Sequence, residues 1–108
     1  MDNLIKKIYD MMYSPIVTPY NLLENAKLDN YSYVKYYKSE NGLIAEMECF
    51  IPEEGKKIFY YHFDQRDYLE SIYMQDNGEK RKVFDRDSAI KEAKDEYYQQ
   101  REQYEKVV

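Results

Sequence analysis

The spacing of hydrophobic residues changes twice along this chain, and its first part has the spacing of amphipathic helices. Apolar residues recur there every three or four positions, at Leu4, Ile5, Ile8, Met11 and Met12. Pro15 ends the first helix, because the residue before a proline is disfavoured in the helical conformation. Thr18 and Pro19 then supply a capping residue and a first-turn proline. The pattern predicts N-terminal helices over about 2–14 and 19–27.

In the middle of the chain, apolar and polar residues alternate with a period of two, which is typical of β-strands. Turn-forming pairs interrupt this alternation at Asn41-Gly42, Glu54-Gly55 and Asn77-Gly78. Asn-Gly is a strong hairpin signal, because both residues tolerate positive φ. The alternation predicts strands over about 31–40, 43–52, 57–64, 68–75 and 80–84.

Helical spacing returns at the end of the chain, where it predicts a helix over about 87–104. Its apolar stripe is narrow and weakens beyond about Gln100. The stripe consists of Ile90, Ala93, Tyr97, Arg101, Tyr104 and Val108. We therefore expect residues 1–108 to form a single α+β domain, in which an antiparallel four- to five-stranded β-meander is flanked by N-terminal helices and a C-terminal helix.

The turn positions also predict which residues share a face of the sheet, since loop length sets strand register. A two-residue loop at Asn41-Gly42 places Lys35 opposite Glu48. A similar loop at Glu54-Gly55 places His62 opposite Met47, on an aliphatic face. The other face then combines aromatic rings with carboxylates. We expect this second face to bind a partner through Tyr33, Tyr37, Glu46, Glu48, Phe50, Phe59, Tyr61 and Phe63.

The width of each helix's apolar stripe predicts which face of the sheet that helix covers. The N-terminal helices have the broader aliphatic surface and suit the face that contains Val34, Met47 and Ile51. The C-terminal helix suits the aromatic face, but its stripe is too thin to cover six rings. The chain is also tyrosine-rich, with 14 tyrosines and no tryptophan, and tyrosine is at home in interfaces. We expect a protein partner or a homodimer to complete the aromatic face.

Residues with catalytic or metal-binding chemistry are few. His62 is the only histidine and Cys49 the only cysteine, and their predicted positions on an apolar face favour structural roles. Asp85, Asp87 and Glu96 match three positions of a calcium loop, but isoleucine stands where that loop requires glycine. The sequence has no glycine-rich phosphate loop. We predict no catalytic residues, metal or cofactor.

Charge narrows the choice of partners. The net charge is −5, and residues 41–75 hold about −4 of it, which disfavours direct binding of nucleic acid. The basic run in residues 79–82 is expected to protect an edge strand from pairing. An inhibitor that mimics nucleic-acid charge is an alternative. Its carboxylates would be Glu46, Glu48, Glu53, Glu54, Asp64 and Asp67.

A lone cysteine and the lack of a long apolar segment favour a cytoplasmic protein without a membrane span. Taken together, these features predict a non-enzymatic protein-interaction or regulatory module of a bacterium, phage or mobile element, which uses an acidic-aromatic sheet face. Besides the charge-mimicking inhibitor, the second alternative is a small enzyme with a site around His62. That alternative requires a pocket at His62 with perturbed titrating groups.

Overall fold

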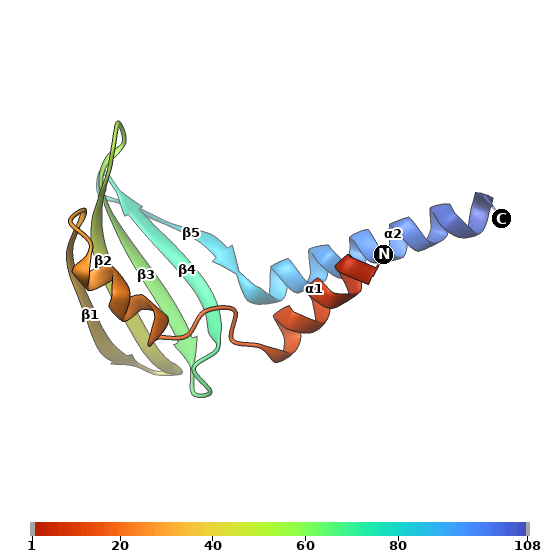
Figure 1. The fold of residues 1–108 in the computed structure, drawn as a ribbon, viewed down its shortest axis with the longest axis horizontal. Coiled ribbons are helices and arrows are strands. Elements are labelled where there is room, and N and C mark those ends of the chain that lie inside the picture. The colour runs from red at the N-terminus through yellow and green to blue at the C-terminus, as the bar shows by residue number, and fades with distance from the viewer. Residues whose placement is uncertain (1, 108) are drawn as a thin grey trace.

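The computed structural model describes the backbone of residues 2–107 and the side chains of residues 3–103 (Figure 1). It confirms the predicted α+β class, with helices beside one antiparallel sheet. The second N-terminal segment is a short 3-10 helix rather than an α-helix. The elements are α1 (Asp2–Tyr13), η1 (Asn21–Lys27), β1 (Tyr31–Ser39), β2 (Gly42–Ile51), β3 (Gly55–Asp64), β4 (Leu69–Asp76), β5 (Glu79–Asp85) and α2 (Arg86–Val107).

The five strands lie side by side in chain order, so β1 and β5 are the edges of the sheet. The predicted register of the first hairpin is wrong by two residues. Lys35 pairs with Glu46 rather than Glu48, and Ser39 pairs with Gly42 across a loop of residues 40–41. Because side chains alternate with a period of two, this shift leaves β2, and β1 from Tyr33 onward, on the predicted faces. A bulge between Tyr31 and Tyr33 places Tyr31 opposite Cys49.

The second hairpin differs from the prediction by an odd number of residues, and this exchanges the two faces of β3. Ile51 pairs with Gly55, so the loop contains three residues and begins at Pro52. Proline has no N–H to donate to a strand ladder, which explains why β2 ends before it. Phe59 consequently pairs with Met47, and His62 pairs with Ile44 rather than Met47.

The core lies between η1 and one face of the sheet, here named the covered face. Its residues include Val34, Tyr36, Leu43, Ala45, Met47, Cys49, Phe59, Tyr61, Phe63, Leu69, Ile72, Met74 and Phe84. Leu22 of η1 belongs to one core cluster with the largest fully buried side chains, Met47, Phe63 and Leu69. The Tyr36 hydroxyl donates to the Pro19 carbonyl over 2.8 Å and ties β1 to this cover. The predicted burial of Cys49 is confirmed.

The two long helices cover neither face of the sheet, contrary to the prediction. α1 packs beside α2, and the pair projects away from the sheet (Figure 1). Met11 of α1 and Ala93 of α2 are buried between them. The apolar stripes of the two helices therefore cover each other, and Tyr104 and Val108 lie outside the described side chains. No helix within residues 2–107 is long and apolar enough to cross a membrane.

Arg86 joins the helix pair to the sheet. Its guanidinium donates one hydrogen bond to the Leu69 carbonyl at 3.3 Å and another to the Ser14 carbonyl at 2.7 Å. Arg86 is only 7% exposed. Nearby, the Tyr68 hydroxyl donates to the Tyr13 carbonyl at 3.1 Å. The ends of α1 and α2 thus meet the start of β4 in one hydrogen-bonded junction.

The junction predicts that Arg86→Met destabilises the protein by about 2–4 kcal/mol, because two carbonyls would lose a charged donor. Amide hydrogen exchange should accelerate in α1 and α2 more than in β2 and β3. Arg81→Met is the control, since Arg81 is exposed on the edge strand β5. Equal acceleration in all elements of the Arg86 variant would contradict a local role at the junction.

Gly42 is required for the close approach of β2 and β3. A Cβ there would lie 2.2 Å from the Phe63 carbonyl oxygen and 2.7 Å from the Asp64 carbonyl carbon. We expect Gly42→Ala to lower the free energy of unfolding by more than about 3 kcal/mol. Gly78→Ala should cost only about 1–2 kcal/mol, from its positive φ, because no neighbouring atom lies within 4 Å. Urea unfolding of both variants tests this order.

Candidate functional site

The second face of the sheet, here named the open face, is the main candidate for function. Among the described residues no helix packs on β2 or β3 from this side, since η1 lies on the covered face. Its side chains are aromatic, aliphatic and charged. They are Tyr33, Lys35, Tyr37, Ile44, Glu46, Glu48, Phe50, Lys56, Ile58, Tyr60, His62, Ser71, Tyr73, Gln75, Lys80 and Lys82.

Glu46 organises the β1 side of the open face. The Tyr33 hydroxyl donates to one carboxylate oxygen over 2.7 Å, and the Tyr37 hydroxyl donates to the other over 2.9 Å. The Lys35 ammonium lies 3.4 Å from the same carboxylate. Only 12% of the Glu46 side chain is exposed. Both carboxylate oxygens are therefore already satisfied within the chain, and the tyrosine rings are held in fixed positions.

These contacts shift the pKa values of the cluster. Burial by itself would raise the pKa of Glu46, but hydrogen bonds from Tyr33, Tyr37 and Lys35 outweigh it, and the net pKa lies below the ordinary value. Burial and the Glu46 carboxylate raise the pKa of Tyr37 to about 12. The same two causes raise the pKa of Tyr33. The cluster consequently keeps an ionised carboxylate between neutral phenols at neutral pH.

The β5 side of the open face combines ammonium groups with aromatic rings. The Lys80 ammonium lies 3.8 Å from the centre of the Tyr60 ring and 5.6 Å from that of Tyr73. The Tyr60 hydroxyl donates to Gln75 over 2.8 Å. Lys82 lies 5.5 Å from the Tyr73 ring and pairs with Asp85 at 3.1 Å. The carboxylates of β2 are thus accompanied by Lys35 and Lys56, whereas Lys80 on β5 lies over aromatic rings.

His62 lies at the end of the open face that meets the helix pair. It lines a polar pocket of about 590 Å³, together with Ser71, Tyr73, Lys82 and Arg86 among others. The His62 Nε2 atom is buried and has no hydrogen-bond partner among the described residues. Burial, with Lys80 and Lys82 nearby, lowers the pKa of His62, so the ring is neutral at pH 7. Cys49 lies on the opposite face, which excludes a thiol–imidazole pair.

The structure divides the eight residues predicted to bind a partner. Five share the open face: Tyr33, Tyr37, Glu46, Glu48 and Phe50. Phe59, Tyr61 and Phe63 lie on the covered face, and their predicted placement is wrong. The sequence analysis missed Ile44, Ile58, Tyr60, His62 and Tyr73 on the open face. Pro52 was the signal that could have found them, because it fixes the end of β2.

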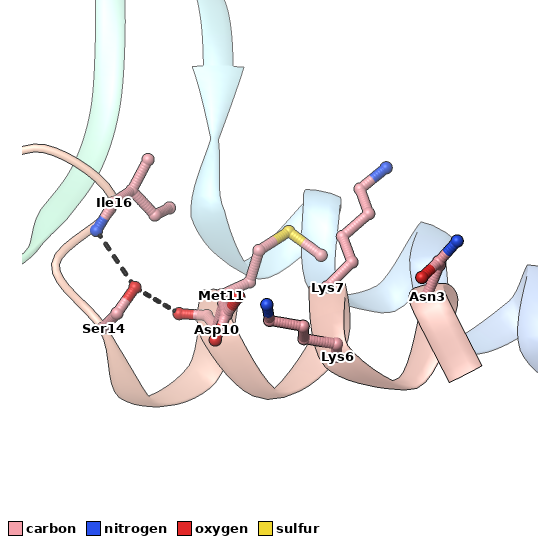
Figure 2. A pocket seen from close by; sticks show the side chains of 7 residues that line it. All are labelled: Asn3, Lys6, Lys7, Asp10, Met11, Ser14 and Ile16. Carbon is pink, nitrogen blue, oxygen red and sulfur yellow. Dashed lines mark hydrogen bonds between the residues drawn. The ribbon is translucent and has the colours of Figure 1, made fainter. Parts of the chain in front are cut away.

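A larger hollow, of about 660 Å³, runs along α1 (Figure 2). It is open to solvent and lined by Lys6, Lys7, Asp10 and other residues of α1 and the following turn. Ser14 closes the helix end there, since its hydroxyl donates to the Asp10 carbonyl over 2.6 Å. The hollow brings together no aromatic ring and no more than one carboxylate, so it has less chemistry for recognition than the open face.

The acidic residues predicted as a weak calcium match have a structural position. Asp85 caps α2, because its carboxylate accepts from the Ser88 N–H and hydroxyl, each at 3.0 Å. Within the described residues, no group of three or more His, Cys, Asp or Glu side chains could hold a metal ion. Comparison with protein families, curated proteins and solved structures found no match to this chain.

The Glu46 cluster predicts a specific dependence of stability on pH. A carboxyl whose folded pKa is lowered stabilises the fold above its ordinary value of 4.5, and this stabilisation is lost as pH falls through the folded pKa. Wild-type protein should therefore exceed Glu46→Gln in stability by about 1–2 kcal/mol near pH 7 and lose this advantage near pH 3. Urea unfolding across this range measures it, with exposed Glu70→Gln as control. A constant difference would contradict the lowered pKa.

Proposed function

We propose that this chain is a non-enzymatic protein-binding module and that the open face is its contact surface. The main observation behind the proposal is a row of half-exposed rings on the face of the sheet that no described helix covers. Phe50 is 51% exposed and Tyr37 is 38% exposed. Apolar surface of this kind marks interaction sites when it is contiguous and has a polar rim. Here lysines and glutamates form that rim.

The open face is also suited to binding because it is already ordered. Tyr33 and Tyr37 are fixed by Glu46, and Tyr60 is fixed by Gln75. Immobilising free side chains costs about 0.5–1.5 kcal/mol each when a complex forms. These tyrosine side chains are already immobilised in the folded sheet, so much of this entropy is not lost again on binding. Rigid aromatic side chains are frequent hot spots in interfaces.

The charges of the open face define the partner that fits it. Around β2, Glu46 and Glu48 are paired with Lys35 and Lys56, whereas Lys80 and Lys82 are exposed on β5. A partner surface with an apolar centre and a carboxylate that faces Lys80 would complement this pattern. Such a pattern is more typical of a folded protein surface than of a uniformly charged polymer.

The charge-mimicking inhibitor receives less support from the same geometry. Its six carboxylates lie in three places: the open face, the β2–β3 loop and the β3–β4 turn. Glu46 is neutralised by its own neighbours, and Asp64 pairs with Arg66 at 3.1 Å. A phosphate mimic needs a continuous row of free charges. The separated carboxylates do not provide one.

The enzyme alternative has a pocket at His62 but lacks a reacting pair. Among the described residues no hydroxyl, thiol or carboxylate forms a hydrogen bond with the imidazole. A general base must lie within hydrogen-bond reach of the group that it activates. The neutral ring packs against Tyr73, with 5.1 Å between ring centres. This arrangement favours a structural role for His62.

The proposal predicts that Phe50→Ala weakens partner binding by about 2 kcal/mol, or roughly thirtyfold, and leaves stability nearly unchanged. Tyr20→Ala is the matched control, because Tyr20 is 70% exposed and precedes η1 on the other side of the sheet. Immobilised wild-type protein and both variants would be compared for capture of proteins from cells that express the chain. A partner retained by wild type and Tyr20→Ala but lost by Phe50→Ala supports the open face. Equal capture by all three would refute it.

A further inference from the structure

The helix pair leaves a second set of large side chains exposed. Ile5, Tyr9 and Tyr13 follow each other at four-residue spacing on α1 and are 47%, 62% and 60% exposed. The Tyr9 and Tyr13 rings lie 4.8 Å apart, so they form one protruding unit. On α2, Tyr98 is 56% exposed. We name these four residues the helix stripe.

A hollow lies at Ile5, one helical turn before Tyr9. It has a volume of about 240 Å³ and runs between the two helices. It is lined by Ile5, Ile8, Lys94, Tyr97 and Tyr98. Ile5 and Tyr98 therefore belong to both the stripe and the hollow. The same surface thus contains exposed tyrosine rings and a recess lined mainly by isoleucine and tyrosine side chains.

The lengths of the two helices add an independent observation. α2 has 22 residues and α1 has 12, which makes α2 about 15 Å longer. In Figure 1, α2 continues past the N-terminus of α1 without another element of the chain beside it. Helices in water owe most of their stability to packing rather than to intrinsic propensity. The outer turns of α2 therefore offer a helix surface on which a second molecule can pack.

We propose that a second copy of this chain packs on the helix stripe and forms a twofold dimer through the helix pair. A twofold interface uses the same surface on both copies, so it requires a surface that complements itself. The Tyr9–Tyr13 unit of one copy would enter the hollow of the other, and the reverse contact follows by symmetry. The outer half of each α2 would then lie along the partner's helices.

The size of the surface suits a weak dimer. The face is two helices wide over the roughly 18 Å of α1 and one helix wide over the remaining 15 Å or so of α2, which gives about 500 Å² per copy. Stable interfaces bury about 800 Å² per partner, and smaller ones are weaker. The pair projects away from the sheet, so the open faces of both copies stay accessible (Figure 1). The dimer is independent of the function proposed for the open face.

Sedimentation equilibrium of the full chain tests the proposal. We expect a dimer with a dissociation constant on the order of micromolar. Ile5→Glu places a charge in the recess and should weaken the dimer at least about a hundredfold. Leu28→Glu is the matched control, since Leu28 is 49% exposed and lies after η1, far from the helix pair. It should keep the dimer.

Two further variants keep the test decisive if Ile5→Glu disturbs α1. Tyr98→Ala should weaken the dimer at least about tenfold, with helix content by circular dichroism unchanged. Phe50→Ala should leave the dimer intact, because Phe50 lies on the open face. A wild-type monomer at roughly 100 µM, about a hundred times the expected dissociation constant, would overturn the proposal. A dimer that Phe50→Ala disrupts and Tyr98→Ala preserves would overturn it equally.

Discussion

The pairing of β2 with β3 decides which side chains this protein buries. The loop that begins at Pro52 sets the pairs Met47–Phe59 and Leu43–Phe63, and these place both phenylalanines of β3 on the face that η1 covers. A shift of one residue would expose Phe63 and bury Tyr60, and no compact core could form around Leu22. Gly42 holds the other end of the same pairing, because only a residue without Cβ fits against the Phe63 carbonyl. The core and the open face are consequences of one register.

The Arg86 junction adds a second level of organisation. Its two hydrogen bonds to backbone carbonyls attach a helix pair that otherwise touches little of the sheet. Burial of a guanidinium costs free energy unless its N–H groups find acceptors. The two carbonyl acceptors therefore fix the position of Arg86. The molecule therefore presents two separate surfaces in a defined geometry. The sheet offers the open face, and the helix pair offers the helix stripe.

The open face shows how a small sheet can hold aromatic residues at its surface. Each tyrosine of this face has a polar neighbour that satisfies its hydroxyl or covers its ring, as Glu46 does for Tyr33 and Lys80 does for Tyr60. These contacts hold the rings in place without covering them completely. The tyrosine-rich composition is explained in part by this arrangement. The same side chains serve the folding of the sheet and, under the proposed function, the binding of a partner.

The sequence by itself determined the elements and their class, because hydrophobic period and turn residues are local properties. It placed all five strands within a few residues, put β2, and β1 from Tyr33 onward, on the right faces and predicted that Cys49 is buried. Tertiary structure decided which side chains of β3 lie on which face of the sheet. One more residue in the β2–β3 loop than predicted exchanges the two faces. It also decided that α1 would pack on α2, since either apolar stripe could have packed on the sheet. That choice depends on which distant surfaces fit together, and no local pattern records it.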